Sequence, residues 1–267
     1  MNTNRTDFDP QLARRLERLY HRYNAKDCMY PDPVCFPHRY ADPADRELAA
    51  LVAASLAYGR VAHIYNSVTR VLDVLGPNPA RRLRESGPER IRRDLCGFVH
   101  RFCTDGDMEG LLSAVARVLE AYGSLEEAFV TGLYPGERSL HPPLCRFVEV
   151  LEDAGAPVGR HLVPRPERGS AVKRLCLFLR WMVRADNVDP GGWTRVPPSL
   201  LVVPLDTHMH RIATRMGFTS RKAADFSCAV EITRRFARIR PDDPVRYDFA
   251  LTRVGMSGED LDKILGL

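Results

Sequence analysis

The chain has 267 residues, of which 45% are hydrophobic and 27% are charged. This length can enclose one large core or two small ones, and the composition excludes a collagen-like or disordered chain. The longest apolar stretches are far too short to span a membrane, so we expect no membrane association. The opening segment 1–7 has no apolar stretch, which argues against a secretory signal.

The seven cysteines form no C-x2-C pair. Their odd number and spacing indicate neither a disulfide framework nor a common zinc or iron–sulfur site. We therefore expect a cytoplasmic protein without a metal or other cofactor.

The formal net charge is +5, and the sequence contains 35 arginines but only four lysines. Arginine forks suit phosphate recognition, and basic residues cluster at 81–93 and 234–246. For either cluster taken alone, a solvated helix face is favoured over a phosphate-binding track. Because arginine supplies nearly every positive charge, each lysine is a candidate for an amine that must lose its proton during a reaction.

All of the secondary-structure elements that the sequence predicts are helices. Apolar residues recur at spacings of three and four, and turn-rich tracts lie at 30–43, 76–79, 155–169 and 186–198. Asp107 is expected to cap a helix that Gly123 ends, and Ser124 with Glu127 forms a capping box. No segment alternates with period two, so the fold class is all-α. The predicted helices cover residues 45–58, 61–75, 108–122, a short segment from 124, 142–153, 171–185, 207–216, 222–237 and 244–254.

The first candidate site surrounds the start of the apolar helix 172–183. Gly169 lets the backbone turn tightly and Ser170 is the expected N-cap, so exposed N–H groups could hold a phosphate. Lys173 lies in the first turn, where the helix dipole and Arg174 favour a neutral, nucleophilic amine. The alternative is an ordinary helix start, with Lys173 extended into water.

The second candidate is Asp206, which follows Pro204 and is placed to cap the next helix. Backbone N–H groups would hold its carboxylate ionised and fixed in direction, so it could stabilise a developing positive charge. A purely structural cap is the alternative. His208 and His210 point to different sides of this helix, so a shared metal is not expected.

Residues 204–212, Pro-Leu-Asp-Thr-His-Met-His-Arg-Ile, resemble the V-D-T-H-x-x-R-V motif of the helix-hairpin-helix DNA glycosylase superfamily, whose Asp is catalytic. Segments 45–58, 169–175 and 247–255 resemble other parts of the superfamily in the same order. The chain is most similar to a bacterial branch, and its 33-residue gap between Lys173 and Asp206 resembles that of archaeal 8-oxoguanine glycosylases. Residues 164–168 lack the L-P-G-V-G hairpin, so the helix-hairpin-helix is degenerate.

The resemblance implies two helical lobes with a DNA-binding cleft between them, one formed by residues 45–204 and the other by 1–44 with 205–267. It implies a monomeric DNA repair glycosylase that acts on double-stranded DNA containing a damaged base or an abasic site. Lys173 and Asp206 would be catalytic, with AP-lyase activity through Lys173; if Lys173 points away, Asp206 would activate water instead. The remaining site residues fall into two groups: a base pocket or wedge (Tyr58, Arg60 and Trp193) and phosphate contacts (Arg168, Gly169, Ser170, Arg174 and His208).

The two tryptophans lie between Lys173 and Asp206. We expect Trp181 in the core, whereas Trp193, in a glycine-containing loop, is the better candidate for stacking on a base. Two other readings compete with the enzyme: a non-catalytic DNA-binding protein that uses the arginine clusters, and a helical metal-dependent hydrolase that uses the eight histidines. The second lacks a recognisable H-x3-H pair.

Overall fold

The computed structural model describes residues 9–157 and 162–267. The opening segment 1–7 and part of the turn-rich tract 155–169 therefore lie outside the described residues. The all-α prediction is confirmed for the part of the chain that the structure describes, apart from one small hairpin. No helix there is both long and apolar enough to cross a membrane. In chain order the helices are α1 Pro10–Tyr23, α2 Pro43–Ser55, α3 Val61–Leu75, α4 Pro79–Glu85, α5 Pro88–Asp94, α6 Asp105–Tyr122, α7 Leu125–Thr131, α8 His141–Asp153, α9 Lys173–Val183, α10 Thr207–Arg215, α11 Phe226–Ala237, α12 Asp248–Ser257 and α13 Leu261–Leu265.

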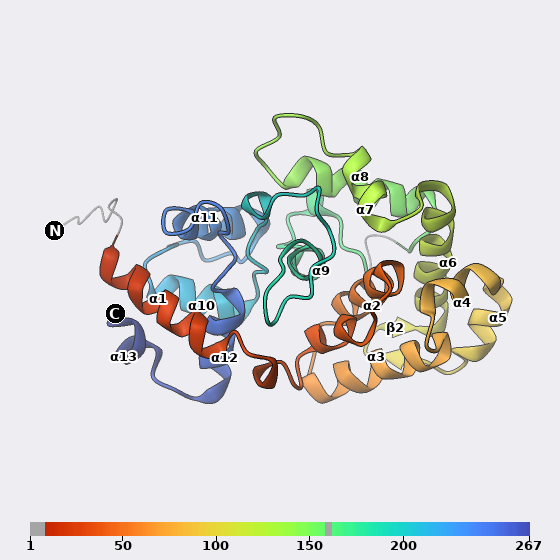
Figure 1. The fold of residues 1–267 in the computed structure, drawn as a ribbon, viewed down its shortest axis with the longest axis horizontal. Helices are drawn as coiled ribbons and strands as arrows, with labels where there is room; N and C mark the ends of the chain where they lie inside the picture. Colours follow the sequence, from red (N-terminus) through yellow and green to blue (C-terminus); the bar gives the residue numbers. More distant parts are fainter. Residues whose placement is uncertain (1–8, 158–161) are drawn as a thin grey trace.

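The helices form two groups with α9 between them (Figure 1). In one group α1 packs along α12 and α13, and α10 packs on α12. In the other, α6 contacts α4, α5, α7 and α8, while α2 packs against α9. One hydrophobic core runs through both groups. The division into lobes at residues 45 and 205 stays a prediction.

Side-chain caps fix where several of these helices begin. Asp42 accepts hydrogen bonds from the backbone N–H groups of Ala44 and Asp45 at the start of α2. Ser124 caps α7 as predicted, accepting from the N–H of Glu127. The prediction for α6 was wrong by one turn, because Thr104 is the N-cap and Asp107 completes its capping box from the third helical position.

The start of α9 also differs from the prediction. Ser170 is not the N-cap; its Oγ accepts from the N–H of Val172 at 3.2 Å, and the helix begins at Lys173. The intervening Val172 has a left-handed backbone, with φ of 44°, which a helix cannot include. Gly169, with φ of 74°, does make the expected tight turn.

Four helices and a hairpin were missed. The apolar stripe of α1 (Leu12, Leu16 and Leu19) is buried but lies among arginines that obscure its periodicity. Helices α4, α5 and α13 are too short to show a period. The strands β1 Val99–His100 and β2 Cys103–Thr104 pair in antiparallel fashion, and two residues each are too few for an alternating pattern.

Candidate active site

A cavity of about 460 Å³ lies between the turn that joins α2 to α3, one face of α9, the start of α10 and one face of α12. Lys173, Leu177, Arg180 and Trp181 all line it, because residues three, four and seven apart share a helix face. Asp206 lines the cavity from α10. The cavity therefore brings together segments that are far apart in sequence.

Lys173 and Asp206 meet at this cavity. The distance from Lys173 Nζ to Asp206 Oδ2 is 2.9 Å, and the two side chains are 33% and 27% exposed. Asp206 is the N-cap of α10, as predicted, and its Oδ1 accepts from the N–H of Met209 at 2.8 Å. One carboxylate oxygen is thus fixed by the backbone, while the other contacts the amine.

The electrostatics of the site favour an ionised Asp206. Burial alone would raise the pKa of Asp206, but attraction to Lys173 and the hydrogen bond from Met209 outweigh it. The pKa of Asp206 is therefore below its ordinary value. A carboxylate held in this way is negatively charged at neutral pH and can face a developing cation without rearrangement.

Tyr58 lines the cavity from the turn that joins α2 to α3. Its hydroxyl donates to the backbone oxygen of His100 at 3.0 Å, and the Arg174 guanidinium lies 5.1 Å from its ring centre. Burial raises the pKa of Tyr58 to about 12. The assignment of Tyr58 to the base pocket or wedge stays a prediction, since the ring lines the cavity and is held by these contacts. Arg60 is exposed at the N-cap of α3, where its role stays a prediction.

Trp193 is not a stacking residue of the cavity. It is 4% exposed, its ring packs on Phe178 and Phe129, and its Nε1 donates to Glu47 at 2.6 Å. The loop that carries it folds back into the core. Trp181 is buried as predicted, and one edge of it also forms part of the cavity wall.

The predicted phosphate contacts divide between two places. Ser170 and Arg174 border a second hollow that also reaches Lys173. His208 lines the main cavity, and its Nδ1 accepts from Arg211 at 3.2 Å. Arg168 and Gly169 are exposed just before α9. Burial lowers the pKa of Arg174, and a phosphate role for any of these residues stays a prediction.

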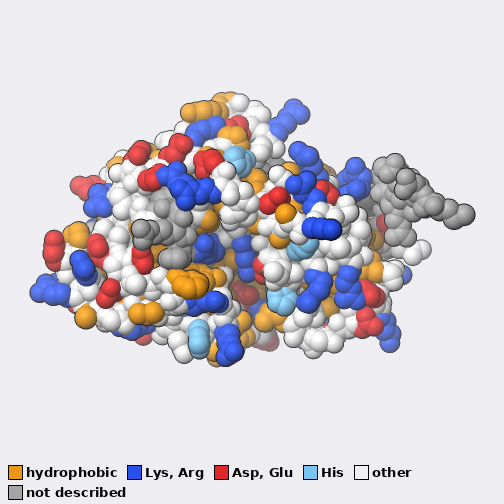
Figure 2. All heavy atoms as spheres, turned by 180° about the vertical axis from the view of Figure 1, so that it is seen from behind, with side chains coloured by type: hydrophobic (Ala, Val, Ile, Leu, Met, Phe, Trp, Pro, Cys, Tyr) orange, Lys and Arg blue, Asp and Glu red, His pale blue; other side chains and the backbone are white. Residues whose placement is uncertain are grey.

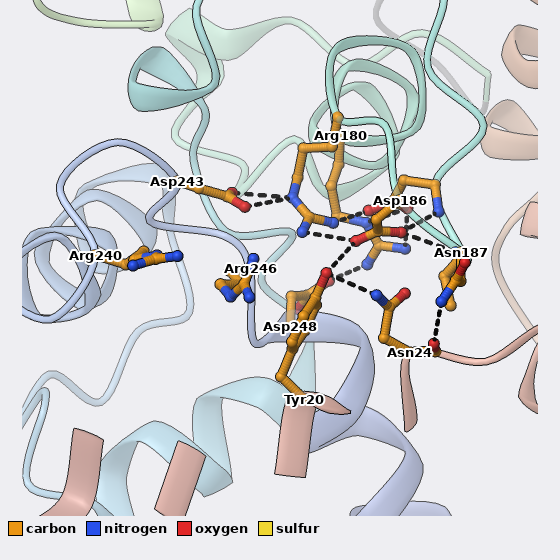
Figure 3. Close-up of polar contacts among 12 residues, drawn as sticks. Tyr20, Asn24, Arg180, Asp186, Asn187, Arg240, Asp243, Arg246 and Asp248 are labelled. Carbon is orange, nitrogen blue, oxygen red and sulfur yellow. Dashed lines mark hydrogen bonds and ion pairs between the residues drawn. The ribbon is translucent and has the colours of Figure 1, made fainter. Parts of the chain in front are cut away.

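A buried ionic network, two members of which also line the cavity, was not predicted (Figure 3). Arg180 pairs with Asp189 and Asp248, and Arg184 pairs with Asp186, Asp189 and Asp243. Burial raises the pKa of Asp248 to about 6, although Arg180 opposes the shift. The network ties α9 to the loop that follows it and to the start of α12. The signal in the sequence was the presence of Arg180 and Arg184 at the end of a stretch, from residue 175 on, that is otherwise apolar.

The wall formed by α12 was also missed. Phe249, Thr252, Arg253 and Met256 face the cavity, and Arg253 donates to Asp32 at 2.7 Å. The Arg253 guanidinium lies 4.6 Å from the centre of the Phe249 ring. The spacing of 249, 253 and 256 along one helix face was a signal that could have been read.

Among the described residues, no group of three or more His, Cys, Asp and Glu side chains could hold a metal ion. Among those residues, the ionisable groups that line the cavity are one amine, three carboxylates, two guanidinium groups, one imidazole and one phenol, from Lys173, Asp32, Asp206, Asp248, Arg180, Arg253, His208 and Tyr58.

The model of a family described as "Protein of unknown function (DUF2400)" matches residues 32–257. No curated protein and no solved structure matches the chain.

Proposed function

Since the chain belongs to the DUF2400 family, whose description states no activity, we propose from its cavity that it is a DNA glycosylase with associated AP-lyase activity. The substrate is double-stranded DNA that contains a damaged base or an abasic site. The degenerate hairpin before α9 and the two adjoining hollows at Lys173 would hold this DNA.

The observation that carries the proposal is the contact between Lys173 and Asp206, 2.9 Å apart on the wall of one cavity. The two residues are separated by 33 positions, and two different helices bring them together. A volume of about 460 Å³ lies within the usual range of about 300–1,000 Å³ for small-molecule sites. An amine and an ionised carboxylate at such a site suit attack on a carbon that becomes electron-poor.

The proposed reaction begins with a nucleotide turned out of the duplex into the cavity, at a cost of about a few kcal/mol. As the N-glycosidic bond breaks, its electron pair leaves with the base and the sugar gains oxocarbenium character. The Asp206 carboxylate stabilises that charge. Lys173 Nζ gives one proton to the departing base and then supplies its electron pair to C1′. A second proton passes from Nζ to O4′ as the C1′–O4′ bond breaks, which opens the sugar ring. The resulting protonated Schiff base leads to strand cleavage.

The charge of the protein supports a polyanionic partner. The formal net charge is +5, and the face opposite that of Figure 1 is hollowed near its middle, with basic side chains at and within the hollow (Figure 2). Phosphate contacts by such side chains position a duplex without reading its sequence.

Borohydride trapping on duplexes that contain an abasic site or 8-oxoguanine tests the proposal. A Schiff base between Lys173 and the sugar would be reduced to a stable covalent adduct. We expect an adduct with the wild type and with Lys222→Ala, but none with Lys173→Ala. Lys222 is a matched control because it is exposed and does not line the cavity.

A panel of other damaged duplexes, scored for base release, separates the remaining outcomes. Base release without trapping would favour the route in which Asp206 activates water. Duplex binding without release or trapping on any substrate would overturn the enzyme and favour a non-catalytic DNA-binding protein. Absence of DNA binding would overturn both the enzyme and the non-catalytic DNA-binding protein.

A further inference from the structure

The hairpin formed by β1 and β2 presents a large apolar side chain to solvent. Arg101 and Phe102 form its turn, and Phe102 is 63% exposed. Val99, on β1, is 64% exposed. The two side chains give this hairpin an exposed apolar surface.

The base of the hairpin is held firmly. His100 is 2% exposed, with its ring nitrogens 2.8 Å from Ser67 Oγ and 3.0 Å from the backbone oxygen of Tyr58. Cys103 is fully buried. Since Tyr58 also donates to the backbone of His100, the hairpin is bound to the segment that lines the main cavity.

The turn itself is strained. Arg101 has a left-handed backbone, with φ of 56°, which residues other than glycine seldom adopt. Its side chain lies over Gly59, where an added Cβ would come within 3.0 Å of Arg101 Cδ. Strain of this kind persists only where the surroundings enforce it, and it often marks a functional position.

Phe102 and Lys173 border the same hollow. This second hollow adjoins the main cavity, because Ala57, Tyr58 and Lys173 line both. The exposed ring and the amine are therefore on the wall of one hollow, which Arg174 and Ser170 also line.

We propose that Phe102 enters the base stack of duplex DNA beside the nucleotide held at Lys173 and Asp206, an inference that rests on the proposed function. Turning a nucleotide out of the duplex leaves a gap between its neighbours, and an apolar wedge can fill such a gap. An aromatic ring stacks on any base, so the contact is independent of sequence. The anchored hairpin keeps the ring in place before DNA binds.

The test measures binding to a duplex that contains a tetrahydrofuran abasic analogue with 2-aminopurine as its neighbour. This probe undergoes no cleavage, so it reports binding and unstacking alone. We expect Phe102→Ala to weaken binding by roughly tenfold, in line with the loss of one aromatic–base stack, and to remove most of the rise in 2-aminopurine fluorescence. Phe102→Trp should retain both.

Val99→Ala is the matched control, because Val99 is equally exposed on the same hairpin but does not line the second hollow. It should bind like the wild type, and thermal melting should show that all variants are folded. If the wild type binds the abasic duplex and Phe102→Ala gives the same affinity and fluorescence, the role of Phe102 is overturned while the proposed function stands. If the wild type does not bind this duplex, the proposed function fails and the inference fails with it.

Discussion

Helix α9 carries two ion pairs seven residues apart that differ in their surroundings. Lys173 pairs with Asp206 at the N-cap of α10, and Arg180 pairs with Asp248 at the first position of α12. In the first pair the side chains are 33% and 27% exposed, whereas in the second they are 4% and 5% exposed. The same helix thus joins two later helices by similar chemistry in different environments.

The difference in exposure determines what each pair can do. Arg180 also pairs with Asp189, so its guanidinium donates to two buried carboxylates. If Arg180 moved away, both carboxylates would lose a partner without gaining water. Lys173 is a compact charge with one carboxylate contact and an open cavity beside it. The enclosed pair holds α9 against α12, and the open pair can exchange its contact for a substrate.

The largest expected effect comes from breaking the enclosed pair. Arg180→Met leaves Asp248 without its arginine and removes one of the arginine partners of Asp189 in a buried site. We expect the free energy of unfolding to fall by about 3–5 kcal/mol, measured by urea denaturation. Arg81→Met is the control, because the pair between Arg81 and Glu85 lies at the surface and should contribute little. Equal losses in the two variants would show that enclosure is not what distinguishes the pairs.

The next effect concerns the open pair. Asp206→Asn keeps a side-chain oxygen that can cap α10 but removes the negative charge. We expect base release to slow by about 10²- to 10³-fold, while the affinity for DNA changes little. Single-turnover kinetics and fluorescence anisotropy on one duplex measure the two quantities. A variant that releases the base at the wild-type rate would refute the electrostatic role of Asp206.

A smaller effect is expected at Trp193, which is buried like the enclosed pair of Arg180 and Asp248. Burial raises the pKa of Glu47, although the Leu125 N–H and Trp193 Nε1 both donate to it. Trp193→Phe removes the indole donor and should lower the free energy of unfolding by about 1–3 kcal/mol. Base release and DNA affinity per folded molecule should be unchanged. If the variant lost DNA binding but kept normal stability, Trp193 would have a direct role in DNA binding.

Local signals in the sequence predicted much of the fold. Helix α3 begins and ends as predicted, and Asp206 caps α10, because periodicity and capping depend on neighbours a few positions apart. The start of α9 was mispredicted because the left-handed backbone of Val172 is imposed by its surroundings and not by its own side chain.

The candidate site was only partly predictable for the same reason. The amine and the carboxylate carry recognisable local motifs, and the structure places them in contact. The partners of Arg180 and the α12 wall depend on tertiary contacts that no local pattern specifies: Arg180 and Asp248 are 68 positions apart, and Arg253 and Asp32 are 221 positions apart. Trp193 was misplaced because a loop position suggested exposure, whereas an acceptor on α2 draws its indole into the core.

The smallest expected effect is a pH dependence of the open pair. The pKa of Asp206 lies below its ordinary value of 3.8, so the ionised carboxylate stabilises the fold fully above that pH and less as the pH falls through the lowered value. The stability advantage of the wild type over Asp206→Asn should therefore be larger at about pH 5 than at about pH 2.5, as urea denaturation can measure. In a Lys173→Met background this difference should shrink, because attraction to Lys173 is a main cause of the lowered pKa. An undiminished difference would mean that the backbone hydrogen bond from Met209, and not the amine, keeps the carboxylate charged.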